Sequence, residues 1–303
     1  MSASNRQALI TKTYKVLKKH YHPVAPPADR SVLEHLLYAC CLENGKHEQV
    51  DEVFARLEQN YFDWNEVRVT TLAELAEVMA PLPDASDAAR RLKRALHSVF
   101  ESHYSFDLEF LKKQNLGKAI EHLEKFNGVT PFGVAYVTQN ALGGHAIPVN
   151  QGVFQFLQLV GILTEAEAAK QRVPGMERAI PKTKGVEFGS LLHQLGVDFA
   201  ASPNAARVRT VVLEIAPDAK DRLPRRPGTK KDGEPRENEP ESKPSSAPPD
   251  SRTEAGSQPT VASKDVPKTG DETDASRRPA AANGGGESAA KSASKRLSRK
   301  KPR

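Results

Sequence analysis

The chain has 303 residues, with 44 Lys and Arg against 38 Asp and Glu. Residues 1–222 hold 26 basic and 26 acidic side chains, so the whole formal excess of +6 lies in residues 223–303. A neutral body excludes a broadly basic nucleic-acid-binding surface, so any such site there must be a local patch or must bind weakly. The two cysteines, Cys40 and Cys41, are adjacent, which excludes a disulfide framework and a four-cysteine metal site within one chain.

The first twenty residues, MSASNRQALITKTYKVLKKH, have the charged and apolar pattern of an amphipathic helix and not that of a secretory signal. No apolar run approaches the ~18 residues needed to cross a bilayer. We therefore expect a cytoplasmic protein with no membrane partner, which would be associated with the nucleoid if it binds DNA.

Residues 1–222 predict a series of short helices around a shared core. Ser or Thr followed by Glu three residues later is a capping-box pattern, and it begins helices at Ser31, Thr71 and Thr164. Apolar side chains recur at three- and four-residue spacing in 33–40, 50–57 and 72–78. Further helices are expected at 87–103, 116–125, 131–142, 151–160 and 186–199, and a strand is expected at the β-branched run 208–215.

Residues 223–303 are rich in Pro, Ser, Ala, Gly and mixed charge, and almost no large apolar residue occurs there. Such a segment cannot offset its ordering entropy by burial, so we expect a disordered C-terminal tail. Its end, KSASKRLSRKKPR at 291–303, carries seven basic residues and no acid. This basic end can contact nucleic acid without sequence preference, or it can be a solvated tail without a dedicated partner.

One compact helical hairpin is expected at about 116–143. A helix at 116–125 is followed by the turn Phe126-Asn-Gly-Val129, and a second helix opens with Thr130 as N-cap and Pro131 at its first position. This order of helix, tight turn and helix is a helix-hairpin-helix layout.

The stretch from Phe126 to Phe156 resembles the endonuclease III family of helix-hairpin-helix DNA glycosylases. That family's signature is a Leu-Pro-Gly-Val-Gly hairpin with a Lys two residues on, then a helix, then Val-Asp. Gly128 and Val129 match the hairpin, and fainter similarity extends over 25–205. The resemblance implies an all-α, two-lobed DNA-glycosylase fold and a role related to base-excision repair.

The departures from the family pattern fall on its chemistry. Phe132 stands where bifunctional members place the Lys that attacks the sugar C1′, and Asn150 stands where the family has its Asp. An uncharged amide cannot stabilise a cationic sugar as a carboxylate does, and losing such a group commonly costs about 10²- to 10⁴-fold in rate. We therefore expect no residue at these positions to be catalytic.

Other family features are also missing. The iron-sulfur cluster needs four cysteines just after the position matching Phe199, but 200–215 contain none, so no cofactor and no metal site are expected. Thr130 replaces the second hairpin glycine, which weakens a close approach to phosphate without excluding it. Cys40 falls where members place a Gln that fills the gap left by an extruded base.

The remaining resemblance favours DNA as a partner, assisted by the tail, with a protein partner as an alternative. The candidate contact residues are Gly128, Val129 and Thr130 in the hairpin and Arg90, Arg91 and Arg94 in the densest basic cluster of the body. The alternative for that cluster is an exposed helix face balanced by nearby acids. Asn150 can cap a helix or orient a water, and we favour the helix cap. Phe132 can belong to the core or stack on a base, and we favour the core.

The sequence thus predicts a glycosylase-fold protein that has lost its chemistry and serves as a DNA-binding or interaction module. One alternative is an active, cluster-free DNA N-glycosylase, a hydrolase without lyase activity that uses other residues. Another is a scaffold that binds only protein.

Overall fold

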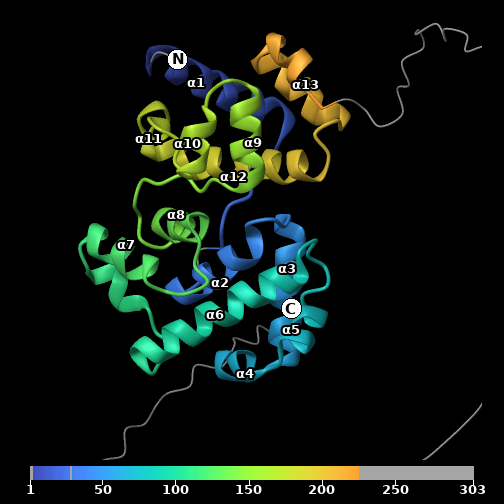
Figure 1. Cartoon of the computed structure of the whole chain (residues 1–303). Helices are drawn as coiled ribbons and strands as arrows, with labels where there is room; N and C mark the ends of the chain where they lie inside the picture. The colour runs from blue at the N-terminus through green and yellow to red at the C-terminus, as the bar shows by residue number, and fades with distance from the viewer. Residues whose placement is uncertain (1–2, 28, 225–303) are drawn as a thin grey trace, which may run out of the picture. The chain divides into compact units, whose positions relative to one another are not determined.

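In the computed structural model, the residues that can be described are 3–27 and 29–224, and they lie within a single compact unit (Figure 1). Nearly all of the predicted tail, including its basic end at 291–303, falls outside these residues. No helix in the described ranges is both long enough and apolar enough to span a membrane.

The described residues form helices joined by short loops and contain no strand, which confirms the all-α class. The elements in chain order are α1 (Ala3–His20), α2 (Val32–Leu42), α3 (His47–Asn60), α4 (Trp64–Val69), α5 (Leu72–Val78), α6 (Ala85–His103), η1 (Glu109–Lys113), α7 (Leu116–Glu124), α8 (Pro131–Asn140), α9 (Gln151–Leu159), α10 (Glu165–Ala169), α11 (Met176–Ala179), α12 (Lys182–Ala201), α13 (Ala206–Ile215) and η2 (Pro217–Arg222).

Side-chain caps set where several helices begin. Ser31, Thr71 and Thr164 each accept a hydrogen bond from the backbone N–H of the Glu three residues later, and that Glu in turn accepts from the capping residue. All three predicted capping boxes are therefore confirmed. They satisfy N–H groups that have no partner inside the helix, so the chain enters each helix at a defined residue.

The expected strand at 208–215 was wrong, because these residues lie in α13. The buried residues of α13 are Val208, Val211, Val212 and Ile215, and their spacing is that of one helical face. This face packs with α1 in the second core described below, and tertiary burial outweighs the β preference of branched side chains.

Two hydrophobic cores organise the helices. The first core is formed mainly by α2 to α8, which occupy the lower half of Figure 1, and includes Leu36, Leu92 and Phe132. The second core is formed by α1 together with α9 to α13 and η2, and includes Leu17, Phe156 and Leu192. The chain passes from the second core to the first after α1 and returns in the segment between α8 and α9.

A close crossing of α9 and α12 fixes the entry of the chain into the second core. A Cβ atom on Gly152 would lie 2.0 Å from the carbonyl oxygen of Gly196, and one on Gly196 would lie 2.3 Å from Asn150 Oδ1. Only glycine lets the two backbones approach this closely. The crossing therefore determines where Asn150, the residue before α9, is held.

Candidate functional site

The hairpin predicted at 116–143 is present: α7 and α8 are joined by a turn at 125–130 that packs on α6. Gly128 has φ +89°, and a Cβ there would lie 2.6 Å from the carbonyl oxygen of Arg91 and 2.7 Å from Arg94 Cβ. The backbone N–H of Asn127 donates to Ser98 Oγ at 3.1 Å. Gly128 thus allows the hairpin turn to pack directly against α6, the helix that contains Arg90, Arg91 and Arg94.

A groove of about 620 Å³ runs along this contact between α6 and the turn. It brings together three of the predicted DNA contacts, Arg90 and Arg94 from α6 and Gly128 from the turn. The full lining is Leu72, Arg90, Lys93, Arg94, His97, Ser98, Glu101, Asn127 and Gly128. We call this the α6 groove.

The cations of the α6 groove differ in what holds them. Arg94 is exposed, while Arg90 forms an ion pair with Asp87 one turn earlier on the same helix. Lys93 donates to the backbone carbonyls of Arg68 and Thr70 at the end of α4, so its ammonium group is already bound to the C-terminal carbonyls of that helix. Of the three cations in the groove, Arg90 and Arg94 are therefore better placed than Lys93 to meet an anion from solvent.

Arg91 lies on a different side of α6 and is committed to the interior of the fold. Its Nη2 donates to Asp84 Oδ2 at 2.8 Å, its Nε donates to the carbonyl oxygen of Cys40 at 3.1 Å, and Glu43 Oε2 lies 3.8 Å away. These partners hold its pKa above the ordinary arginine value despite the opposing effect of burial. Of the three predicted arginines, the structure therefore brings two, and not Arg91, to the groove.

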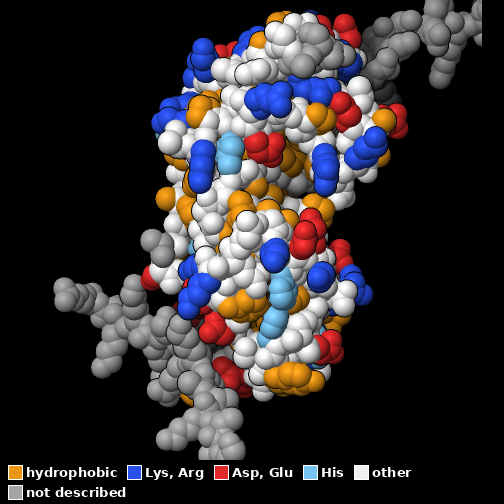
Figure 2. Space-filling model, turned by 90° about the vertical axis from the view of Figure 1, so that its left-hand side faces the viewer, with side chains coloured by type: hydrophobic (Ala, Val, Ile, Leu, Met, Phe, Trp, Pro, Cys, Tyr) orange, Lys and Arg blue, Asp and Glu red, His pale blue; other side chains and the backbone are white. Residues whose placement is uncertain are grey.

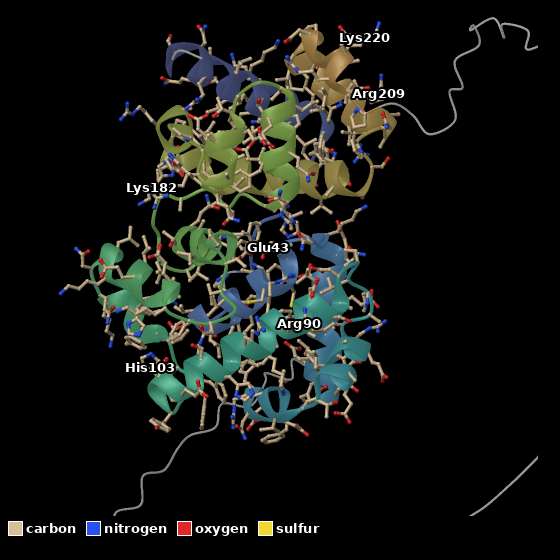
Figure 3. All side chains as sticks on the ribbon, viewed as in Figure 1. Glu43, Arg90, His103, Lys182, Arg209 and Lys220 are labelled. Atoms are coloured by element: carbon tan, nitrogen blue, oxygen red, sulfur yellow. The ribbon has the colours of Figure 1, made fainter. Side chains whose placement is uncertain are left out.

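The side chain of Thr130 forms a hydrogen bond with the carboxylate of Glu43. Its hydroxyl accepts from the Gly133 N–H at 3.2 Å, which makes it the N-cap of α8, and donates to Glu43 Oε2 at 3.0 Å. Burial raises the pKa of Glu43, while Arg91 and Thr130 act against that rise. Figure 3 labels Glu43, which directly follows α2, and Arg90 on α6. A carboxylate of the chain itself thus lies at the N-terminal end of α8, the kind of helix end that attracts anions.

Phe132, which the sequence resemblance matches to the family's Lys, is only 2% exposed and belongs to the first core. Its ring centroid lies 6.2 Å from that of Tyr136 and 5.5 Å from that of His193. The side chain therefore fills the space between α8 and α12, as the core reading predicted, and presents no nucleophile.

Asn150, which the sequence resemblance matches to the family's Asp, caps α9 as expected. Its Oδ1 accepts from the Val153 N–H at 2.9 Å, and its Nδ2 lies 3.2 Å from His193 Nδ1. His193 Nε2 lies 3.0 Å from the carbonyl oxygen of Gly45, which can only accept, so Nε2 carries the proton and Nδ1 accepts from Asn150. The amide can donate a hydrogen bond to the unprotonated Nδ1 of this tautomer, whereas an ionised carboxylate has no hydrogen to donate.

His193 is a residue of this region that the sequence analysis did not identify. It links Asn150 at the start of α9 to Gly45 in the loop after α2, so it connects the two cores. Burial, and after it the nearby His47 ring, lower its pKa to about 3, although the hydrogen bond to Gly45 acts in the opposite direction, so the imidazole is neutral. Its position within the long helix α12, with no motif around it, left no sequence signal.

These histidines give the protein a predicted loss of stability in acid. Burial also lowers the pKa of His35, to about 4. Because the unfolded chain takes up these protons near pH 6.5 and the folded chain does not, the free energy of unfolding should fall as pH drops from about 6.5 toward 3–4, by about 1.4 kcal/mol per pH unit for each histidine. Urea unfolding at pH 7.5, 6.5 and 5.5 measures this slope.

The matched variants for that slope are His193→Gln and His22→Gln. His193→Gln should reduce this slope by about 1.4 kcal/mol per pH unit, the contribution of one proton, while His22→Gln replaces an exposed histidine and controls for the substitution itself. Equal slopes in wild type and His193→Gln would contradict the buried neutral state.

A small cavity remains between Phe132, His193 and their neighbours. It encloses about 20 Å³ and is lined by Val24, Pro26, Leu42, His47, Phe132, Tyr136, Gln139, Asn140, Pro148, Val186, Gly189, Ser190 and His193. Two of its buried polar atoms, His47 Nε2 and Asn140 Oδ1, have no hydrogen-bond partner. Since a water needs about 10–15 Å³, this space fits a water and not an extruded base.

The residues do not fit the family's iron-sulfur cluster. Four thiolates are needed, yet the sequence has only Cys40 and Cys41, both buried on α2 and free. Desolvation raises the pKa of Cys40 to about 12, so its thiol is protonated and unsuited to metal binding. In the described residues no group of three or more His, Cys, Asp or Glu side chains is arranged to hold a metal ion.

No protein-family model matches the chain, and no curated protein matches it by sequence. Among solved structures it is similar to endonuclease III in a non-covalent complex with DNA, with 16% identity and a TM-score of 0.53 over 73% of this chain and 98% of that one. A thermostable thymine-DNA glycosylase is matched with 18% identity and a TM-score of 0.46 over 64% of this chain and 88% of that one. The described part of this chain therefore has the helical fold of endonuclease III.

Proposed function

We propose that this protein is a divergent relative of the endonuclease III-like DNA glycosylases that binds DNA and has lost lyase and glycosylase chemistry. The main support for a loss of chemistry is that side chains fill the region that would correspond to the family's active site. Phe132 fills it, Asn150 is held by His193, and about 20 Å³ of space remains. An iron-sulfur cluster is likewise absent in this proposal, since the chain lacks the thiolates.

DNA binding is supported by the α6 groove. The body has no net charge, so contact with phosphates must come from a local group of cations. Arg90 and Arg94 lie beside the Gly128 turn, where a backbone phosphate could meet both guanidinium groups and the turn. This contact positions the duplex without reading its sequence.

The groove is tested by the double variant Arg90→Glu/Arg94→Glu in the full-length chain. We expect DNA affinity at low salt to fall by about tenfold or more, and the dependence of log Kd on log salt to lose about two units, because two phosphate contacts are removed. Fluorescence anisotropy with a labelled duplex at several salt concentrations measures both. The matched control, Lys170→Glu/Lys220→Glu, makes the same charge change at two exposed residues, Lys170 directly after α10 and Lys220 in η2.

Two outcomes of that comparison would count against the groove. Equal losses in both double variants would show that only total charge matters, and no loss in either would assign binding to residues outside the groove.

Glu43 should oppose DNA binding at the hairpin. Its carboxylate accepts from Thr130 at the start of α8, where it competes with an approaching phosphate. We expect Glu43→Gln, which can keep this hydrogen bond without the charge, to raise DNA affinity about two- to fivefold at low salt. Glu48→Gln removes the same charge from an exposed position of α3 and should have a smaller effect in the same anisotropy assay. Weaker binding by Glu43→Gln would contradict the repulsion.

A second candidate function is a slow N-glycosylase without lyase activity. The observation that favours it is that two residues lining the small cavity, His47 and Asn140, each have a buried polar atom without a hydrogen-bond partner, Nε2 and Oδ1. Burial lowers the pKa of His47, so its imidazole is a free base that could accept a proton from a water bound there. This candidate requires the cavity to open before a base can enter.

A further inference from the structure

A pair of histidines joins the end of α6 to the first helix of the hairpin. His103 is the last residue of α6 and His122 lies in the last turn of α7, and their Nε2 atoms are 3.1 Å apart. Both side chains are partly exposed. Figure 3 labels His103 at the end of α6, and Figure 2, which turns that side of Figure 1 toward the viewer, shows histidine side chains together at the surface.

The two rings are held in place by their neighbours. Phe110 of η1 lies 5.0 Å from the His103 ring and 5.5 Å from the His122 ring, and the largely buried Phe126 lies 6.0 and 5.6 Å from them, between centroids. Such packing fixes both imidazoles before any ligand arrives, which lowers the entropy cost of binding.

The ring geometry is close to that of a chelate. Two imidazoles that share one metal ion at about 2.1 Å from each nitrogen, with those nitrogens 3.1 Å apart, have ring centroids about 4.8 Å apart and a bite angle of about 95°. A straight N–H···N hydrogen bond of the same length would separate the centroids by about 5.4 Å. The observed separation is 5.0 Å with an interplanar angle of 32°, closer to the convergent arrangement.

We propose that His103 and His122 form a two-histidine site for a divalent transition-metal ion, with solvent at the remaining coordination positions. Two neutral imidazoles suit Cu²⁺, Ni²⁺ and Zn²⁺, whereas Mg²⁺ and Ca²⁺ prefer oxygen ligands. Among the divalent ions Cu²⁺ should bind most tightly. The bound ion would clamp α7 to α6 and so stabilise the hairpin; this site does not depend on the proposed function.

The test uses tag-free, full-length protein that has been freed of metal with a chelator. All nine histidines of the sequence lie in the described residues, so the tail contributes none. Ni²⁺, Zn²⁺ and Cu²⁺ are titrated at pH 7.5, above the ordinary imidazole pKa of about 6.5, with Mg²⁺ as a negative control. Calorimetry gives affinity and stoichiometry, and the rise in Tm with metal concentration gives a second measure.

We expect one ion per chain, and binding at least tenfold weaker in His103→Gln and in His122→Gln. His97→Gln, which removes a histidine from the groove face of the same helix, should bind as wild type does. The electron paramagnetic resonance spectrum of the Cu²⁺ form should show two nitrogen ligands in wild type and one in each single variant, which distinguishes ligation from a loss of stability. Wild-type affinity in both single variants, or no binding of any of the three metals at micromolar concentration, would overturn the proposal.

Discussion

Replacing Gly152 by Ala should lower the free energy of unfolding by about 3 kcal/mol or more. The added Cβ would lie 2.0 Å from the carbonyl oxygen of Gly196 and 2.8 Å from its carbonyl carbon, and both are backbone atoms that cannot turn aside. The α9 and α12 helices would have to move apart, and the second core would loosen with them.

Urea unfolding at pH 7.5 measures this loss, with Gly117→Ala as the control. Gly117 lies in the first turn of α7, where an added Cβ would be 3.4 Å from Asn115 Oδ1, so the change should be neutral or slightly stabilising. If Gly152→Ala and Gly117→Ala have the same free energy of unfolding, α9 and α12 do not approach each other as closely as the structure has them. The placement of Asn150 beside His193 would then be wrong as well.

Replacing Phe132 by Lys should not recreate a nucleophile and should cost about 3–5 kcal/mol of stability. The change removes a buried ring that packs on Tyr136 and His193 and places an ammonium group in its space. The fold can accept the amine only by neutralising it or by admitting water. Because Asn150 supplies no carboxylate to pair with the amine, no Schiff base should form with an abasic site.

Phe132→Leu is the matched variant, since it removes the ring without adding a charge and should lose less stability than Phe132→Lys. Borohydride reduction in the presence of an abasic duplex traps any Schiff base as a covalent adduct. A trapped adduct in the Phe132→Lys single variant would contradict this expectation and show that one substitution is enough for Schiff-base formation.

Much of the fold could be predicted because local signals and burial agree. The capping boxes at Ser31, Thr71 and Thr164 and the hairpin with Thr130 as N-cap are local features, and each begins a helix where expected. The run at 208–215 failed because its composition favours a strand while the spacing of its buried residues is helical, and the spacing decided the structure.

The site was harder to predict because its details depend on contacts far apart in the chain. Arg91 and Arg94 are equivalent in a basic cluster, but only the structure shows that Arg91 pairs with Asp84 and that Arg94 faces the groove. Nothing in the sequence connects Glu43 to Thr130, 87 residues away. His103 and His122 likewise have no spacing signature and meet only because α6 and α7 pack together.

In the proposed function, the chain keeps the DNA-binding surface of this fold without its chemistry. The most direct measurement incubates full-length protein with duplexes that carry an abasic site, a uracil or an oxidised guanine, and follows binding, base release and strand cleavage together. We expect binding to every duplex with no release or cleavage above a mock preparation. Release or cleavage that rises with protein concentration would contradict it, and its loss in His47→Gln would assign the activity to the second candidate function.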